Sequence, residues 1–501
     1  MRKETPGPEN FNEISIERKA GTMKISVIGT GYVGLVAGTC LAEFGHEVTC
    51  IDRIKEKIDC LKSGKCPIHE EGLEDLIKKN AAAGRLDFST DLATSVSNSQ
   101  AVFLGVGTPE GPSGKTDLSA LRGAARQVAQ NMRGYTLVVI KSTVPVGTAE
   151  EISRLINHNI RHLATFDIVS NPEFLRQGTA VYDFLNPERV ILGASSETGV
   201  KLIREIYESF VERDIPIIET TNETAEVIKY AANSFLAVKI SFINEMASIC
   251  QKVNADISQI SRALGMDRRI APGCLNPGPG FGGSCLPKDV KSLIYTARGA
   301  KYRFRLGRAA LDVNKHQHKA VVDKLRQTLG SLRRKRIALL GVAFKANTDD
   351  TRESPAIHIA RRLYREGAEL VAYDPVAMKL GKIDIPEVAF VDSAYDACYN
   401  ADATLLLTEW QEFRELDFAR IKMLMARPVL HDTRNCLDGQ KMIALGFEYK
   451  DNGRMTRPSA IGTSRQVEAS SLSLNFESSS GKHEKISPPV SASGAVALGK
   501  S

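Results

Sequence analysis

Short apolar runs alternate with helical segments along most of the chain. The first run, at residues 24–28 (KISVI), leads into a helical segment that ends near residue 44, and a second run follows at residues 48–51. Further runs of this kind lie at residues 101–106, 137–140, 167–169, 189–192 and 216–218. This alternation is typical of an α/β protein with a doubly wound parallel sheet.

A long amphipathic segment separates this first unit from a second one. It runs from residue 221 to about residue 253, which is long enough to link two domains and to carry a dimer contact. Beyond it, strands are expected at residues 336–340, 369–373, 403–407 and 429–430. Ser354 and Pro355 predict a helix start in this second unit, because serine is a favourable N-cap and proline suits the first helical turn.

A glycine-rich turn follows the first predicted strand. Its sequence is Gly29-Thr30-Gly31-Tyr32-Val33-Gly34, and Asp52 stands at the end of the second strand. Strand, glycines, helix, strand and acid in this order are the fingerprint of a Rossmann dinucleotide site, with the acid placed for the ribose hydroxyls. An acid at position 52 would repel a 2′-phosphate, so we predict that the cofactor is NAD rather than NADP.

The second unit has no such glycine fingerprint. Its strand ends carry Lys345, Arg352 and Arg434 instead, and cations in this position suit a phosphorylated ligand other than the dinucleotide. The predicted fold is therefore two Rossmann-like doubly wound domains joined by a long central helix and a small helical middle domain. The expected parts are a flexible extension (1–22), the NAD-binding domain (23–215), the central helical domain (216–325), the second Rossmann-like domain (326–455) and a disordered tail (456–501).

Composition and charge narrow the classes of function. Apolar residues make up 43% of the chain and charged residues 25%, as in globular proteins, and no apolar run is long enough to span a membrane. The net charge of +7 is scattered rather than clustered, so no nucleic-acid partner is expected. The nine cysteines show no metal-type spacing, which predicts no metal site and a reducing cytoplasmic location.

One thiol lies in a glycine loop just ahead of a predicted helix, in the stretch Gly280-Phe281-Gly282-Gly283-Ser284-Cys285-Leu286-Pro287-Lys288-Asp289. The helix dipole and Lys288 would favour the thiolate, which makes Cys285 a candidate nucleophile. The alternative is that Cys285 is a small buried apolar residue. On the long helix, Lys229 and Asn233 lie one turn apart, a spacing that on its own indicates a solvated face.

Several motifs occur together and in order, namely NPEFLRQGTA, KYAANSFLAVK, FGGSCLPKD, AFKANTDDTRESPA and DTRN. Over about residues 23–455 the chain thereby resembles the UDP-glucose/GDP-mannose dehydrogenase family, and most closely the branch that acts on UDP-glucose. The resemblance implies NAD-dependent four-electron oxidation of UDP-glucose to UDP-glucuronate, through a cysteine thiohemiacetal and thioester. The alternatives are GDP-mannose or a UDP-N-acetylhexosamine as substrate, an ordinary two-electron dehydrogenase, and a non-catalytic sugar-nucleotide sensor. Ser284, where a histidine would indicate the N-acetyl branch, argues against that substrate.

The resemblance also implies catalytic roles. Cys285 would attack the sugar, while the glycines before it would let the sugar approach. Lys229 would stabilise oxyanions at C6, and Asn233 would help to orient them. Asp289 and Thr143 would handle protons and water. Glu173 would assist hydrolysis of the thioester.

Binding residues follow from the same motifs. For NAD they are Gly29, Gly31, Tyr32, Val33, Gly34, Asp52, Lys57, Thr108, Thr143 and Arg352. For UDP-glucose they are Glu173, Phe174, Leu175, Lys229, Asn233, Asn276, Gly280, Phe281, Gly282, Phe344, Lys345 and Arg434. Arg269 would reach the substrate of the neighbouring subunit in a homodimer.

Two positions depart from the family pattern. Gln177 stands where the family often has an acid, so a contact that needs a carboxylate there is in doubt. The loop at residues 272–275 lacks the bulky aromatic residue and the lysine expected of close relatives. Cys274 in this loop is expected to pack rather than to pair with Cys285, because a disulfide would consume the nucleophile.

Overall fold

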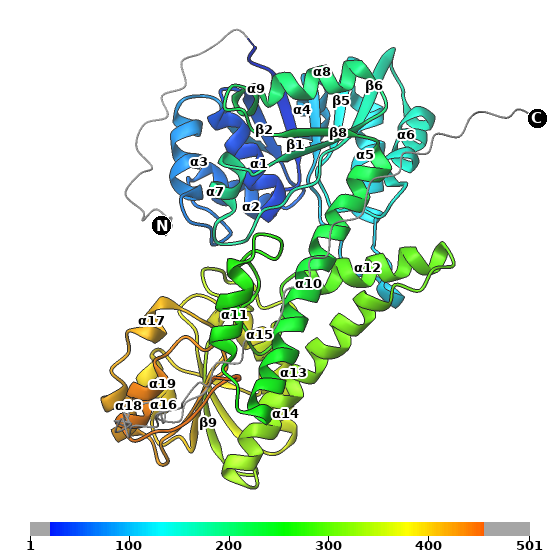
Figure 1. Cartoon of the computed structure of the whole chain (residues 1–501). Helices are drawn as coiled ribbons and strands as arrows, with labels where there is room; N and C mark the ends of the chain where they lie inside the picture. The colour runs from blue at the N-terminus through cyan, green and yellow to red at the C-terminus, as the bar shows by residue number, and fades with distance from the viewer. Residues whose placement is uncertain (1–20, 455–501) are drawn as a thin grey trace, which may run out of the picture. The chain divides into compact units, whose positions relative to one another are not determined.

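A computed structural model describes residues 21–454 (Figure 1). The extension predicted for residues 1–22 falls almost wholly outside the described residues, and the tail predicted for residues 456–501 falls wholly outside them. None of the helices in the described range is long and apolar enough to cross a membrane.

The first sheet has eight strands in the order β3-β2-β1-β4-β5-β6-β7-β8. Their bounds are β1 Lys24–Ile28, β2 Glu47–Ile51, β3 Leu86–Ser89, β4 Ala101–Leu104, β5 Gly134–Ile140, β6 Ala164–Ser170, β7 Val190–Ala194 and β8 Ile217–Thr220. The sheet thus extends past residue 215, to Thr220. Every neighbouring pair is parallel except β6 and β7, which are antiparallel. Strand β7 therefore starts at the carboxyl edge of the sheet, where β6 ends, so the loop between these two strands begins and ends at that edge.

Helices cover both faces of this sheet, as a doubly wound fold requires (Figure 1). One buried cluster joins α1, α2, α3, α7, α8 and α9 to the sheet, and a second joins α4, α5 and α6 to the other face. The bounds are α1 Tyr32–Glu43, α2 Lys55–Lys62, α3 Leu73–Ala82, α4 Leu92–Ser97, η2 Pro112–Gly114, α5 Ser119–Asn131, α6 Thr148–Asn159, α7 Ala180–Leu185, α8 Glu197–Ile206 and α9 Glu208–Val211.

The predicted long helix is α10, Asn222–Val253. Thr221 caps it, because its hydroxyl oxygen accepts a hydrogen bond from the backbone N–H of Thr224 at 3.2 Å. Three further helices follow, α11 Ile257–Met266, α12 Leu286–Gly299 and α13 Arg305–Leu329. A small apolar cluster that includes Ala237, Phe281 and Val290 holds α12 and its preceding loop against α10.

The second sheet has six parallel strands in the order β11-β10-β9-β12-β13-β14. Its strands are β9 Arg336–Leu340, β10 Glu369–Tyr373, β11 Ala389–Phe390, β12 Ala403–Leu406, β13 Val429–Asp432 and β14 Glu448–Lys450. Its helices are α14 Pro355–Arg365, α15 Met378–Asp384, α16 Ala394–Cys398, α17 Gln411–Arg414, α18 Phe418–Leu424 and α19 Gly439–Ala444. Ser354 caps α14 and Pro355 opens it, so the predicted helix start is confirmed.

Candidate active site

The glycine turn after β1 is packed too closely for larger residues. A Cβ on Gly29, whose φ is +103°, would lie 2.8 Å from the carbonyl oxygen of Gly105, and one on Gly34 would lie 1.9 Å from the carbonyl oxygen of Gly29. A Cβ on Gly31, in contrast, would meet no neighbouring atom of the described residues within 4 Å. The turn therefore joins strand and helix tightly and leaves room at Gly31 for close approach of a pyrophosphate.

Asp52 lies at the carboxyl end of β2 and faces this turn. Its carboxylate accepts hydrogen bonds from the N–H and hydroxyl of Thr30, at 3.0 and 2.7 Å, and from the N–H of Ile54 at 3.0 Å. Burial opposes the charged form, but these bonds and Lys57, 3.8 Å away, outweigh it and lower the pKa of Asp52. A fixed negative charge here favours ribose hydroxyls over a 2′-phosphate.

The other residues implied for NAD lie at three places. The hydroxyl of Thr108 donates to the carbonyl oxygen of Thr143 at 2.8 Å, which ties together the loops after β4 and β5. Val33 is half-buried in the first turn of α1. The hydroxyl of Tyr32 donates instead to Asp349, beyond β9, and Arg352 pairs with Asp350 in the same loop.

A buried ion pair forms the centre of the candidate catalytic site. The ammonium of Lys229, on α10, lies 3.0 Å from the carboxylate of Glu173, and both side chains are about 95% buried, with 5% and 4% exposed. Burial opposes the charge of Lys229, but Glu173, together with Cys285 and Asp289, outweighs that effect and raises the pKa of Lys229. The Phe174 ring, 5.2 Å from the ammonium, covers the pair. The N–H of Leu175 donates to Glu173 at 2.6 Å and fixes its orientation.

Asn233 and Asp289 add a second polar contact between α10 and α12. The amide of Asn233 donates to the carboxylate of Asp289 at 2.6 Å, and both residues are buried. Cys285 is the N-cap of α12, and its carbonyl oxygen accepts the N–H of Asp289 at 2.8 Å. The charges of Lys229, Glu173 and Asp289 all act on the Cys285 thiol. The fold thus brings these five residues together, although Lys229 and Asn233 alone had suggested only a solvated face.

The expected bias toward the Cys285 thiolate is wrong for this structure. Although Cys285 is an exposed residue, the protein around its thiol raises the pKa through desolvation, and the charge of Glu173 adds to the rise, while Lys229 lowers it only in part. The ammonium of Lys288 is bound 2.6 Å from the carboxylate of Asp289, so it is not held for the sulfur. The surroundings of Cys285 therefore favour the thiol over the thiolate.

The glycines before Cys285 are closely packed against neighbouring segments. A Cβ on Gly282 would lie 2.3 Å from the carbonyl oxygen of Glu353, and one on Gly283 would lie 2.9 Å from the Phe344 ring. Gly280 has a φ of +124°, and a Cβ there would lie 2.6 Å from Asn314. The loop is therefore pressed against the segment that follows β9.

The remaining residues implied for the nucleotide sugar are spread over the second sheet and the cysteine loop. Arg434 donates to the carbonyl oxygens of Leu407, at 2.8 Å, and Phe344, at 2.9 Å. Burial lowers the pKa of Lys345. Phe281 is buried in the small apolar cluster, whereas Asn276 is exposed. The side chain of Arg269 is 89% exposed and pairs with Asp267.

Lys141 is a neighbour of the site to which the sequence analysis gave no role. Its buried ammonium donates to the amide oxygen of Asn171 at 2.9 Å, and the hydroxyl of Tyr207 donates to the same oxygen at 2.7 Å. Burial lowers the pKa of Lys141 to about 8, against the opposing charge of Glu173. Lys141 follows β5 and Asn171 follows β6. This position at the carboxyl ends of neighbouring strands was the signal in the sequence that could have placed both residues near the site.

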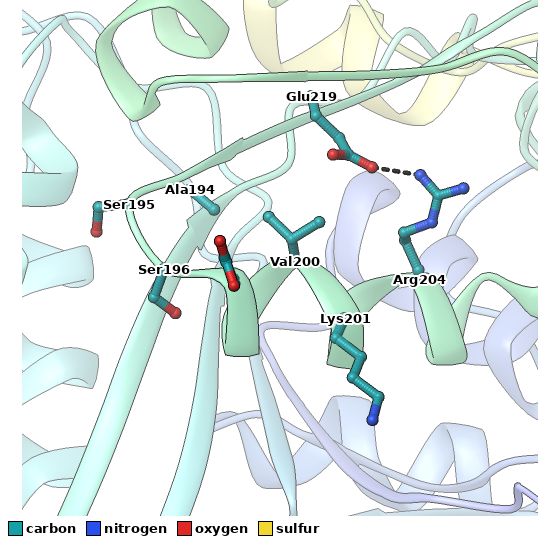
Figure 2. A pocket seen from close by; sticks show the side chains of 8 residues that line it. Ala194, Ser195, Ser196, Val200, Lys201, Arg204 and Glu219 are labelled. Atoms are coloured by element: carbon teal, nitrogen blue, oxygen red, sulfur yellow. Dashed lines mark hydrogen bonds and ion pairs between the residues drawn. The ribbon is translucent and has the colours of Figure 1, made fainter.

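A separate surface pocket lies at the β7–α8 edge of the first sheet (Figure 2). Its wall includes Ser196, Val200 and Lys201, and Arg204 pairs with Glu219 across it. None of the predicted site residues lines this pocket. Within the described range no group of histidine, cysteine or acidic side chains could hold a metal ion, and the nine cysteines are free thiols.

Comparisons with known proteins cover nearly the whole described chain. Three models of the UDP-glucose/GDP-mannose dehydrogenase family match, the NAD binding domain at residues 23–211, the central domain at 223–316 and the UDP binding domain at 338–439. UDP-glucose 6-dehydrogenase TuaD of Bacillus subtilis is 43% identical over 441 residues, which are 88% of this chain and 94% of that protein. The UDP-glucose 6-dehydrogenase of Rhizobium meliloti is 44% identical over 436 residues, 86% of this chain and all of that protein.

Comparison with solved structures leads to the same family. A UDP-glucose dehydrogenase from Pyrobaculum islandicum superposes with a TM-score of 0.82 at 33% identity, covering 88% of this chain and 99% of that one. A UDP-D-ManNAc dehydrogenase from Pyrococcus horikoshii gives 0.77 at 29% identity, covering 87% and 100%. By sequence and by fold, the chain belongs to the UDP-glucose/GDP-mannose dehydrogenase family.

Proposed function

We propose that this protein is an NAD-dependent UDP-glucose 6-dehydrogenase, which oxidises UDP-glucose to UDP-glucuronate in two hydride transfers. The observation that carries the proposal is the convergence of Cys285 with the Lys229–Glu173 ion pair and the Asn233–Asp289 contact. A two-electron dehydrogenase needs no thiol at this place, and a sensor needs neither the thiol nor the buried ion pair. The names of the curated relatives support the choice of UDP-glucose.

The first domain fits NAD. The tight turn at Gly29 and Gly34, the open side of Gly31 and the fixed carboxylate of Asp52 suit a pyrophosphate and a ribose. The other residues that would hold the cofactor are Tyr32, Val33, Lys57, Thr108, Thr143 and Arg352. When bound, NAD supplies the acceptor for a hydride from C6, and a second NAD supplies it for the second oxidation.

The chain's own residues handle the charge at C6. In the first oxidation Asp289 accepts the proton of the C6 hydroxyl and passes it to solvent through Thr143. The Cys285 sulfur then bonds to the aldehyde carbon, and its proton also goes to Asp289. Lys229 and Asn233 stabilise the oxyanion that forms.

The second oxidation converts this thiohemiacetal into a thioester, which water hydrolyses. Glu173, beside Lys229, accepts a proton from the attacking water, the carbon–sulfur bond breaks and the thiol is restored. The product carboxylate takes one oxygen from that water. The ion pair thus serves twice, because Lys229 stabilises the oxyanion in both the attack and the hydrolysis.

The nucleotide end of the substrate is assigned to the second domain. Phe344, Lys345 and Arg434 lie on the loops that follow its strands, where ligands of open α/β sheets bind. The family's UDP binding domain matches this region. The substrate contacts completing the site are Phe174, Leu175, Asn276, Gly280, Phe281 and Gly282.

The proposed assembly is a homodimer built on α10. Phe235, Phe242 and Ile249 recur at heptad spacing on this helix and are 64%, 45% and 48% exposed, which leaves an apolar stripe for a second copy. Arg269, exposed and outside its own site, would then reach the site of the other subunit. The free thiols support a cytoplasmic location.

A substrate panel tests the proposed function. UDP-glucose, GDP-mannose and UDP-N-acetylglucosamine are each incubated with the protein and NAD, and NADH is counted per molecule of product acid. We expect turnover with UDP-glucose and the highest kcat/KM for it. A preference for GDP-mannose or for the N-acetyl sugar would move the enzyme to another branch of the family, and no NADH with any of them would favour the sensor.

A further inference from the structure

The loop between β4 and α5 (residues 105–118, the β4–α5 loop) folds back on itself. An isolated antiparallel bridge joins Glu110 to Thr116, on either side of the short helix η2. Thr108, which the proposed function assigns to NAD, lies near the base of the loop, where its hydroxyl donates to the carbonyl oxygen of Thr143. The part of the loop beyond Thr108 lies instead against α12.

The β4–α5 loop contacts α12 at two neighbouring residues of the helix. The hydroxyl oxygens of Thr116 and Ser292 lie 2.8 Å apart, and the ammonium of Lys291 lies 2.9 Å from the carboxylate of Glu110. A Cβ on Gly114 would lie 3.4 Å from the Cβ of Lys291, so the loop approaches the helix closely. The loop that carries a residue assigned to NAD is thus attached to the helix that opens with the proposed nucleophile.

Ser292 also joins α12 to α10, the helix against which α12 packs (Figure 1). Its hydroxyl donates to the hydroxyl oxygen of Tyr230 at 3.2 Å, and since this hydroxyl has one proton, its oxygen is left to accept from Thr116. Thr116, Ser292 and Tyr230 are only 3%, 2% and 1% exposed. Tyr230 directly follows Lys229, and Ser292 lies one helical turn after Asp289. The chain of hydroxyls therefore ends on the helical turns that carry these two residues.

The buried hydroxyls contribute more to this contact than the ion pair does. Lys291 and Glu110 are each 32% exposed, and ion pairs open to solvent contribute little. Lys291 also lies 3.9 Å from the carboxylate of Glu353, so Glu110 is not its only acid. A buried hydroxyl that loses its partner keeps its full desolvation cost. Removal of the hydroxyl of either Thr116 or Ser292 should therefore weaken the contact.

We propose that Ser292 is a positioning residue, which through Thr116 and Tyr230 holds the β4–α5 loop on the two helices of the catalytic site. The inference rests on the proposed function, since that function assigns Thr108 to NAD and Lys229 to the C6 oxygen. A loop attached to α12 keeps Thr108 at a fixed place relative to both helices. The cofactor and the sugar are thereby held in one relative position, as hydride transfer requires.

The test removes single hydroxyls with little change of shape, in Thr116→Val, Ser292→Ala and the double variant. Steady-state kinetics give KM for NAD and for UDP-glucose, and calorimetry gives Kd for NAD without turnover. We expect each single variant to raise KM and Kd for NAD by about three- to tenfold, with KM for UDP-glucose unchanged. The double variant should be no worse than the single ones, because either change breaks the same chain of hydrogen bonds.

Matched variants control for the substitutions themselves. Thr116→Ser keeps the hydroxyl and should bind NAD as wild type does. Thr165→Val, at an exposed position of β6 outside the proposed site, removes a threonine hydroxyl and should also leave NAD binding unchanged. Melting temperatures identify a variant that fails to fold, and if Thr116→Val does so, Ser292→Ala and Thr116→Ser make the same comparison. A purely structural role would lower the melting temperature without changing KM for NAD.

Three results would overturn the positioning role. They are wild-type affinity for NAD in Thr116→Val and Ser292→Ala, effects that add in the double variant, and an equal rise of KM for both substrates. Wild-type protein that binds NAD in the calorimeter but yields no UDP-glucuronate would instead overturn the proposed function itself.

Discussion

At the scale of single residues, the site depends on the Lys229–Glu173 ion pair. Two opposite charges that are this deeply buried stabilise each other only as a pair, and removal of one leaves the other desolvated and unpaired. In the proposed mechanism the same ammonium stabilises the C6 oxyanion. Stability and catalysis therefore share one contact, and a pair of variants can separate them.

Lys229→Met tests both roles. We expect kcat to fall by about 10²–10³-fold, as when an oxyanion donor is lost. The free energy of unfolding should fall by about 3–5 kcal/mol, because Glu173 stays buried without its partner. Steady-state kinetics and urea unfolding measure the two effects. Lys229→Met combined with Glu173→Gln should recover most of the stability but none of the activity, and recovered activity would remove Lys229 from the mechanism.

Lys141 predicts a pH dependence of stability. Its folded pKa of about 8 lies below the usual lysine value of about 10.4, so between these values the unfolded chain binds more protons and stability rises with pH. Relative to Lys141→Met, wild type should gain about 3 kcal/mol between about pH 7 and pH 10.5. Urea unfolding at both pH values measures this gain. A difference between the two proteins that stays constant would mean that Lys141 keeps an ordinary pKa.

At the scale of elements, α12 and the glycine loop before it place Cys285, the proposed nucleophile. The loop is held to α10 through the apolar cluster with Phe281, and to the segment after β9 through the close approach of Gly282 and Gly283. The position of Cys285 is therefore set by contacts on both sides of the loop. A side chain added at one of these closely packed glycines should displace the Cys285 thiol.

Gly283→Ala tests this dependence. The added Cβ would meet the Phe344 ring at 2.9 Å, at a backbone φ of +82° that favours glycine. We expect a loss of about 1–3 kcal/mol in stability and a lower kcat. Gly299→Ala, at the end of α12, where an added Cβ would meet no neighbouring side chain of the described residues within 4 Å, should lower neither stability nor kcat. A Gly283→Ala enzyme as active as wild type would show that the loop tolerates displacement.

The apolar pattern predicted most elements but not how they pair. It placed the long helix within a residue of α10, whose burial changes regularly along its length. It missed β3, β11 and β14, which are only two to four residues long. It also could not show that β7 runs antiparallel to β6, because a buried apolar strand has the same pattern in either direction.

At the scale of the whole molecule, the site is assembled from segments far apart in the sequence. Glu173 follows β6, Lys229 and Asn233 lie on α10, and Cys285 and Asp289 flank the start of α12. Local patterns named each segment as chemically active, and the family motifs related them to one another. They could not reveal contacts such as Gln177 with Asp350, nor that desolvation would raise the pKa of the thiol, because both depend on the packing of distant segments.

In the proposed mechanism one thiol, that of Cys285, holds the substrate between its two oxidations. The most direct test counts NADH and UDP-glucuronate formed from a limiting amount of UDP-glucose, with wild-type protein and with Cys285→Ser. We expect two NADH and one UDP-glucuronate per UDP-glucose for wild type, and no release of free UDP-glucuronate by the variant. One NADH per sugar with wild type, or normal turnover by Cys285→Ser, would contradict it.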